Sequence, residues 1–389
     1  MAELDFVRVL VVVGLVLFHS SLVFDVNDDF YVKNAETTGI TTIFAGFGVL
    51  WAMPLLFLIA GFGAWHSLRR RGPGGFALER LRRIGVPLVF GTTVLVPVPQ
   101  WLRLRADPAY HESYLAFLPR FFDIRVEPWE FPFVLQGDSF ETGHLWFLLL
   151  LLAFALMLAP VVRWFPAAGA RALGGGLAAL ARRPGAALLP ALPLALVSAV
   201  LGLEEEYAGW SRWAYLLFFV YGLMLASDER LRDALRRDRR AAVVGGLLLP
   251  AVGLPLFLVA EGDAFTDLNP TAMVARALYG AAGWCWLVGI MALLDRRRPS
   301  QGAGGGGGRR LYAYLSEGVL PLYVLHQPIV VVVAFWVVRW SVPGPVKFVA
   351  IVAMSLVLIL AAYDLLVRRT AVTRFLFGMR PARRGGTPS

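Results

Sequence analysis

The chain has 389 residues, of which 58% are hydrophobic and only 16% are charged, and its mean hydropathy is +0.65. This composition excludes an ordinary soluble enzyme and indicates a protein with several membrane-spanning helices that lie in a lipid bilayer. The net charge of +10 does not indicate nucleic-acid binding, because the arginines fall in short clusters between apolar segments, as membrane topology requires.

At about 20 apolar residues per crossing, the sequence predicts an all-α polytopic membrane protein. We expect ten transmembrane helices, at 6–24, 42–66, 84–102, 144–164, 186–203, 212–227, 241–260, 271–294, 317–338 and 346–367. The first should be retained as a helix, since Glu3 and Asp5 replace the basic start of a cleavable signal. We expect one transmembrane domain over 1–370 and a disordered, basic cytoplasmic tail over 371–389.

The loops between the predicted helices alternate in charge. The acidic residues Asp25, Asp28, Asp29 and Glu36 follow the first helix. The basic residues Arg69, Arg70, Arg71, Arg80, Arg82 and Arg83 follow the second helix. Later loops continue the pattern. Because basic loops face the cytoplasm, both termini are predicted to be cytoplasmic.

Three further features of the sequence are explained without a catalytic or ligand-binding role. The aromatic and proline-bearing stretch 105–143 is typical of an outer interfacial segment, either a simple anchor or a lid over a cavity. The glycine run Gly302–Gly308 lacks the lysine of a phosphate-binding loop, so we interpret it as a flexible cytoplasmic linker. The single cysteine, Cys285, excludes a disulfide framework and is interpreted as a packing residue.

Histidines are the most informative polar residues inside the apolar segments. His19 lies in the first predicted helix and His326 in the ninth, and both are predicted near the middle of the bilayer, where the two rings would meet. His144 is predicted at the outer end of the fourth helix. His66 and His111 fit interfacial or solvated positions.

An imidazole at this depth suits proton transfer, because its ordinary pKa near 6.5 lets it take a proton from a hydroxyl and return it to a leaving group. The competing interpretation of His19 is a structural ring hydrogen-bonded to a neighbouring helix. A metal site is not supported, because no His-x-x-x-His pair exists in the sequence and the apolar segments around His19 and His326 supply no carboxylate ligands.

Arginines at the inner face form the second group. Arg80 and Arg83 are spaced i, i+3 before the third predicted helix, and Arg8 lies eleven residues before His19. Forked guanidinium groups bind phosphates well. Membrane topology alone also explains basic residues at this face, so both interpretations stay open.

Together these motifs resemble the membrane acyltransferase-3 family. The resemblance rests on Leu4-Asp5-x-x-Arg8 with His19, on Arg80-x-x-Arg83, on Gly143-His144-Leu145-Trp146-Phe147-Leu148, and on Tyr323-Val324-Leu325-His326-Gln327-Pro328. It covers nearly the whole chain in order and spacing. The last two segments look most like the branch that contains glucan succinyltransferases of bacterial periplasmic glucan synthesis.

The resemblance implies a ten-helix enzyme of the bacterial cytoplasmic membrane that transfers an acyl group from cytoplasmic acyl-CoA to an extracytoplasmic hydroxyl, often on a glycan. It implies that His19 is the catalytic histidine and that Arg8, Arg80 and Arg83 bind the donor, which is a substrate and no permanent cofactor. Some members carry a fused outer domain after the helices, whereas we expect this chain to work with the membrane domain alone, so acceptors of those members are not transferred to it.

We therefore expect His19 to act as general base, or alternatively as a transient acyl carrier, with His326 and Tyr323 orienting the acceptor or polarising the carbonyl. We assign His144, Trp146 and Asp5 to substrate binding. The rival functions are a secondary transporter or lipid-linked flippase and a non-catalytic membrane scaffold. The sequence leaves the acyl group, the acceptor and a homo-oligomeric state open.

Overall fold

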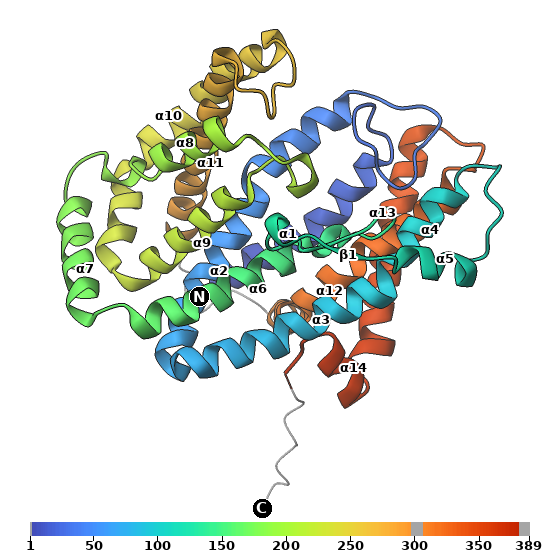
Figure 1. The fold of residues 1–389 in the computed structure, drawn as a ribbon, viewed down its shortest axis with the longest axis horizontal. Coiled ribbons are helices and arrows are strands. Elements are labelled where there is room, and N and C mark those ends of the chain that lie inside the picture. The colour runs from blue at the N-terminus through green and yellow to red at the C-terminus, as the bar shows by residue number, and fades with distance from the viewer. Residues whose placement is uncertain (1, 297–305, 381–389) are drawn as a thin grey trace, which may run out of the picture. The chain divides into compact units, whose positions relative to one another are not determined.

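The computed structural model describes residues 2–296 and 306–380, and these are mostly helical, as predicted. The helices are α1 (Ala2–Leu22), α2 (Ile40–Arg80), α3 (Val86–Phe90), α4 (Pro97–Arg105), α5 (Tyr114–Phe121), α6 (Trp146–Trp164), α7 (Ala167–Ala181), α8 (Ala191–Leu201), α9 (Arg212–Ser227), α10 (Glu229–Val259), α11 (Pro270–Arg296), α12 (Gly306–Val337), α13 (Gly344–Ala362) and α14 (Ala371–Leu376) (Figure 1). Short 3₁₀ turns are η3 (Pro128–Glu130), η4 (Gly143–Leu145), η5 (Ala186–Leu188) and η6 (Glu205–Tyr207), and π-helical segments are η1 (Leu81–Gly85), η2 (Gly91–Leu95) and η7 (Tyr363–Val367). The strands β1 (Arg125–Val126) and β2 (Leu135–Gln136) form an antiparallel hairpin.

The exact count of ten membrane spans is not confirmed. Within the described residues, six helices are long and apolar enough to cross a membrane, and Phe6–Leu22 and Ala186–Leu201 are shorter apolar helices. The second and third predicted helices belong to one helical stretch, Ile40–Arg105, which bends at Gly72, where φ is 68°. Glycine adopts this φ without a steric cost, so the chain turns there without a loop.

The chain divides into two compact units of interleaved segments. The single transmembrane domain over 1–370 stays a prediction. As far as they are described, the first unit is built on Phe47–Ala77 and Phe154–Ala303, and the second on Asp5–Gly46, Leu78–Ala153 and Gly304–Ser389. Helix α2 passes from the second unit into the first and back. Neither unit is therefore a continuous piece of the sequence.

The first unit is held together by close helix packing. Helices α10 and α11 run side by side (Figure 1). Helices α2 and α9 cross so closely that a Cβ at Gly61 would collide with the carbonyl of Phe219, and one at Gly222 would collide with the carbonyl of Leu58. Only glycine allows this backbone-to-backbone contact. Cys285 is buried in α11 beside Gly245 of α10, which fits the packing role predicted for it.

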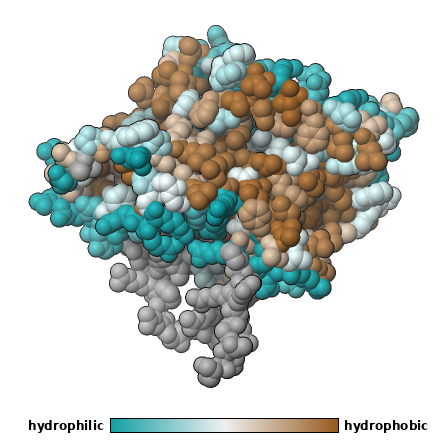
Figure 2. All heavy atoms as spheres, turned by 60° about the horizontal axis from the view of Figure 1, so that its bottom comes forward, coloured by the Kyte–Doolittle hydropathy of each residue, from teal (hydrophilic) through white to brown (hydrophobic). Residues whose placement is uncertain are grey.

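Large apolar side chains are exposed along the long helices, as lipid contact requires. On α10, Leu248 is 60% exposed and Leu258 is 80% exposed, and on α13 Val357 is 66% exposed. Figure 2 shows hydrophobic residues over much of the visible surface. Since each such side chain would cost about 1.5–3 kcal/mol in water relative to an apolar environment, this surface agrees with a multi-pass membrane protein.

The second unit contains α12 and α13 packed as neighbours and a short C-terminal helix, α14. The Phe377 ring, just after α14, lies 5.3 Å from the Phe90 ring of α3, and Phe377 is 6% exposed. Residues 371–380 thus fold against the unit, where the sequence predicted a disordered tail. The apolar residues Phe377 and Met379, which are both buried, explain the difference. Residues 381–389 and the linker glycines up to 305 lie outside the described part of the chain.

The loop that follows α4 forms structure of its own. Helix α5 buries Phe117 and Phe121 completely, whereas Trp129 in η3 is 76% exposed. Ser113 caps α5 by accepting a hydrogen bond from the N–H of Ala116. A loop with one exposed indole and two buried phenylalanines fits both of the predicted roles, an interfacial anchor and a lid.

Candidate functional site

Three histidines from distant parts of the sequence meet in the second unit. The ring centroids of His19 and His326 lie 4.9 Å apart, and those of His326 and His144 lie 5.0 Å apart. The predicted meeting of His19 and His326 is confirmed. His144, predicted separately at the outer rim, belongs to the same cluster, and His326 lies between the other two rings.

The cluster lies at helix ends. Helix α1 ends at Leu22, so His19 occupies its last turn, and His144 lies in η4, directly before α6. At 1.5 Å per residue, His19 is about 4.5 Å from the end of α1 and about 16 Å from Arg8. The depth of His19 near the middle of the bilayer stays a prediction. The cluster adjoins the loops whose acidic residues predict the outer side.

Hydrogen bonds hold His144 and Tyr323 in place. The Tyr323 hydroxyl donates to the backbone carbonyl of His144. The backbone N–H of His144 donates to Oε1 of Gln327 over 3.0 Å, and its Nε2 bonds the carbonyl of Val324 over 3.0 Å. A carbonyl only accepts, so this Nε2 carries the proton. The proton of the Tyr323 hydroxyl is thus already bound to a backbone carbonyl, which leaves it poorly suited to polarise a substrate carbonyl.

By contrast, two ring nitrogens in the cluster are open. His326 is 1% exposed; its Nδ1 donates to the carbonyl of Tyr323, and its Nε2 is buried without a hydrogen-bond partner among the described residues. Nδ1 of His19 is likewise buried and unpartnered within the described chain. Buried polar atoms are normally satisfied, so exceptions of this kind mark places for chemistry.

The loop after α1 covers the cluster. The Phe30 ring stacks on the His19 ring at 5.8 Å with an interplanar angle of 24°, and the Tyr31 hydroxyl donates to the Glu141 carboxylate. Burial, and secondly the charge of Glu141, raises the pKa of Tyr31 well above its ordinary value, so Tyr31 remains a donor. No sequence pattern predicts that Phe30, Tyr31 and Glu141 lie at the cluster, because their proximity depends on tertiary contacts.

Lys33 fixes this loop on the end of α1. Its ammonium donates to the carbonyls of Leu22 over 3.0 Å and Asp28 over 2.7 Å, and also to that of Asp25. Burial lowers the pKa of Lys33, against the opposing charges of Asp28 and Asp25. The cation at a helix C-terminus satisfies carbonyls that the helix leaves open and thereby holds Phe30 over His19.

The predicted donor arginines form a second group around Glu79. Arg80 Nε lies 3.6 Å from Glu79 Oε2, and Arg83 Nη1 lies 3.4 Å from Glu79 Oε1. Arg83 Nε also donates to the carbonyl of Gly378 over 3.3 Å. Arg83 belongs to the π-helical segment η1, whose wider turn changes the shared α-helical face predicted for the pair. The sequence analysis missed Glu79, although it lies next to Arg80.

The remaining predicted residues are placed less closely. Arg8 lies in α1, and Trp146 begins α6 with its ring 6.4 Å from that of Phe147. Asp5 is helical, but its side chain lies outside the described part of the structure. The structure thus joins His19, His144, Tyr323 and His326 in one cluster and Arg80 with Arg83 in another.

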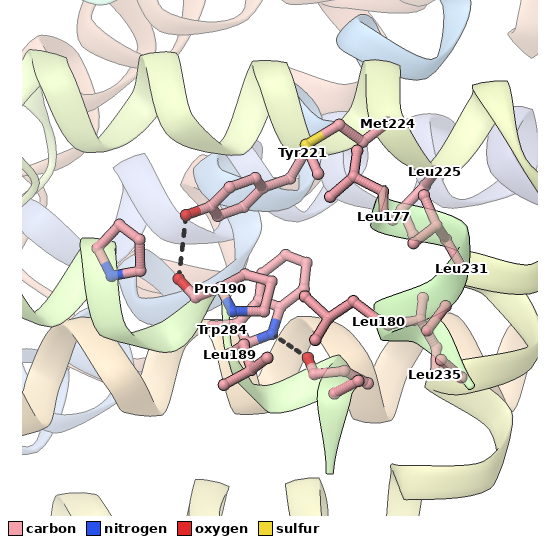
Figure 3. Close-up of a pocket in the computed structure, with 15 residues that line it drawn as sticks. Leu177, Leu180, Leu189, Pro190, Tyr221, Met224, Leu225, Leu231, Leu235 and Trp284 are labelled. Carbon is pink, nitrogen blue, oxygen red and sulfur yellow. Dashed lines mark hydrogen bonds between the residues drawn. The ribbon is translucent and has the colours of Figure 1, made fainter. Parts of the chain in front are cut away.

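A separate apolar cavity of about 240 Å³ lies in the first unit, between α7, η5, α9, α10 and α11. Its two polar side chains are bound to the backbone: the Tyr221 hydroxyl donates to the carbonyl of Pro190 over 3.1 Å, and the Trp284 indole donates to that of Ala187 over 2.7 Å (Figure 3). Among the described residues that line it there is no histidine, carboxylate or basic group. This cavity supplies no acid or base.

Comparisons with known proteins agree with these features. A family model described as "Acyltransferase domain" matches residues 1–364, which include both clusters and all but the end of the described chain. No curated protein and no solved structure matches the chain. Among the residues that the structure describes, no group of three or more His, Cys, Asp or Glu side chains is placed to hold a metal ion.

Proposed function

The chain belongs to the acyltransferase-3 family, and we propose that it transfers an acyl group from cytoplasmic acyl-CoA to a hydroxyl of an extracytoplasmic acceptor. It is a membrane acyltransferase with several spanning helices. The proposal adds the donor, the acceptor and the catalytic base. The observation that carries it is the buried histidine cluster with two open nitrogens at the loop end of α1.

In the proposed reaction His19 is the general base. The acceptor hydroxyl gives its proton to His19 while its oxygen forms a bond to the acyl carbonyl carbon. The carbon–sulfur bond to CoA then breaks, and His19 returns the proton to the thiolate, which leaves an ester and free CoA. General-base catalysis of this kind contributes typically about 10²–10⁴-fold in rate.

The arginine group supports the donor assignment. CoA carries several phosphates, and guanidinium groups bind phosphate oxygens in a forked geometry. We propose that Arg80 and Arg83, with Arg8 on α1, hold these phosphates while the acyl end extends toward His19. Glu79, which contacts both guanidinium groups in the structure, would keep them apart and oriented.

The position of the cluster supports an acceptor that enters from the outer side. His19 and His144 lie at helix ends next to the acidic loop 23–39 and the structured loop 105–143. We propose that the acceptor is a carbohydrate, that His144 and Trp146 contribute to its binding, and that the protein works in the bacterial cytoplasmic membrane. Asp5 lies near the opposite end of α1, beside Arg8, so we propose that it contributes to binding of the donor instead.

The test is His19→Ala in the purified full-length protein. We expect acyl transfer from acetyl-CoA or succinyl-CoA to glucose oligomers to fall at least about 100-fold, with an unchanged melting temperature. His111→Ala is the matched control, because His111 is exposed in a loop of the same unit. Near wild-type transfer by His19→Ala would reject His19 as base, and substrate uptake without release of CoA would identify a transporter instead.

A further inference from the structure

The two open nitrogens of the cluster belong to neighbouring rings. Nδ1 of His19 and Nε2 of His326 are both buried without a partner among the described residues, and the two rings lie 4.9 Å apart with an interplanar angle of 41°. Nδ1 of His19 is able to donate a hydrogen bond, and Nε2 of His326 is able to accept one. A hydrogen bond between them would satisfy both atoms.

The proton on His326 has a fixed position. Nδ1 bonds the backbone carbonyl of Tyr323, which has no proton to give, so Nδ1 carries the hydrogen. In the neutral ring Nε2 must then be the acceptor. The Tyr323 residue is itself held, because its hydroxyl donates to the carbonyl of His144. His326 is therefore a rigid acceptor whose free lone pair points into a buried site.

We propose that His326 positions the base: its Nε2 accepts the N–H of His19 Nδ1, and this bond keeps His19 Nε2 free to take the acceptor's proton. This inference rests on the proposed function. His326 has the place that a carboxylate has in a Ser-His-Asp triad, where it sets the tautomer of the base and stabilises the cation formed during reaction.

The charge environment explains why an imidazole occupies this place. Among the described residues no carboxylate is hydrogen-bonded to any of the three rings; Glu141 bonds Tyr31 instead. An ionised carboxylate in this apolar site would be costly to desolvate, whereas a neutral imidazole accepts a hydrogen bond without bringing a charge. The relay then ends on a neutral acceptor, the Tyr323 carbonyl.

The proton balance stays within the cluster and the substrates. His19 Nε2 takes the hydroxyl proton, so that His19 becomes a cation with N–H groups at both nitrogens. Its Nδ1–H remains bonded to His326 Nε2, which spreads the charge but need not take the proton. When the thiolate leaves, the proton on His19 Nε2 passes to sulfur, and both rings return to their starting tautomers.

Two amide variants test this role. The Gln side chain in His326→Gln places its amide oxygen near the position of Nε2, where it accepts from His19. The shorter side chain in His326→Asn ends near the position of Nδ1 and leaves His19 without an acceptor. Both amides are neutral and polar, so a role of His326 in packing alone predicts similar effects for the two.

We expect His326→Asn to lower kcat about 100-fold, with KM for acetyl-CoA or succinyl-CoA within about twofold, and His326→Gln to retain kcat within about tenfold of wild type. The measurement is release of CoA thiol by the full-length protein with glucose oligomers as acceptor, beside a melting curve for each variant. Equal kcat values for the two folded variants would overturn the proposal, as would an unchanged kcat in His326→Asn.

Failure of this inference is distinct from failure of the proposed function. If His19→Ala abolishes transfer while both His326 variants match the wild type, His19 remains the base and the positioning role is rejected. If His19→Ala retains transfer, the base itself is wrong, whatever the His326 variants do. Should either amide variant fail to fold, His326→Met, which fills the site without an acceptor for His19, provides the comparison with the folded one, and full kcat in that variant rejects the role.

Discussion

Arg276 in the first unit and His326 in the second are both ionisable side chains buried in apolar helices, at 0% and 1% exposure. The guanidinium of Arg276 donates from Nη1 to the carbonyl of Ala264 over 3.0 Å and from Nη2 to those of Ala199 and Asp267 over 2.9 and 2.8 Å. Only its Nε lacks a partner in the described structure. His326 instead keeps its one basic nitrogen open.

This difference in hydrogen bonding indicates a structural role for Arg276 and a chemical role for His326. Arg276 donates hydrogen bonds to backbone carbonyls at the end of α8 and in the loop before α11, so its guanidinium group holds the backbone in place. Tyr221 and Trp284 do the same around the apolar cavity. The histidine cluster leaves two buried ring nitrogens without a partner among the described residues. Substitutions in the first unit should therefore change stability, and those in the second should change turnover.

The largest stability effect is expected for Arg276→Met. The substitution leaves the part-buried carbonyls of Ala199, Ala264 and Asp267 without the Arg276 donor. At about 1–3 kcal/mol for each lost hydrogen bond, we expect the free energy of unfolding to fall by about 3–5 kcal/mol. The measurement is thermal or denaturant unfolding in detergent, with transfer activity per folded molecule. Arg240→Met is the control, because Arg240 is exposed on α10 of the same unit. If Arg276→Met kept its stability but lost its turnover, the structural role assigned to Arg276 would be wrong.

A smaller effect, on substrate binding, is expected for the double variant Arg80→Ala, Arg83→Ala. Loss of two phosphate contacts should raise KM for acyl-CoA about tenfold to 100-fold, or about 1.4–2.7 kcal/mol. Steady-state kinetics with varied acyl-CoA measure it. Arg82→Ala is matched, since Arg82 is exposed between the two. If KM stays the same in the double variant, these arginines serve topology alone.

The smallest effect is expected for Tyr221→Phe in the apolar cavity. It removes the hydrogen bond to the carbonyl of Pro190 and should reduce stability by about 1 kcal/mol, with no change in kcat or KM. Tyr279→Phe provides the control, because the Tyr279 hydroxyl has no hydrogen bond within the described chain. A change in kinetic constants for Tyr221→Phe would give the cavity a role in the reaction.

The sequence predicted what depends on local pattern. Apolar runs gave the helices, with 212–227 matching α9 to the residue, and helix position predicted that His19 and His326 meet. His144 is held near these two rings by its hydrogen bonds to Gln327 and Val324, and no spacing in the sequence predicts those hydrogen bonds. The Gly72 bend and the folded segment 371–380 were missed because they depend on a single φ angle and on tertiary burial.

The interleaved order of the two units has a consequence for biosynthesis. His19 leaves the ribosome about 300 residues before His326, and translation proceeds at about 5–20 residues per second. The first helix must therefore wait in the membrane for about 15–60 s before its partner ring exists. During that interval most of the other unit is made. The histidine cluster is thus among the last features of the molecule to assemble, and a truncated chain that ends before α12 has no such cluster, however well the rest has folded.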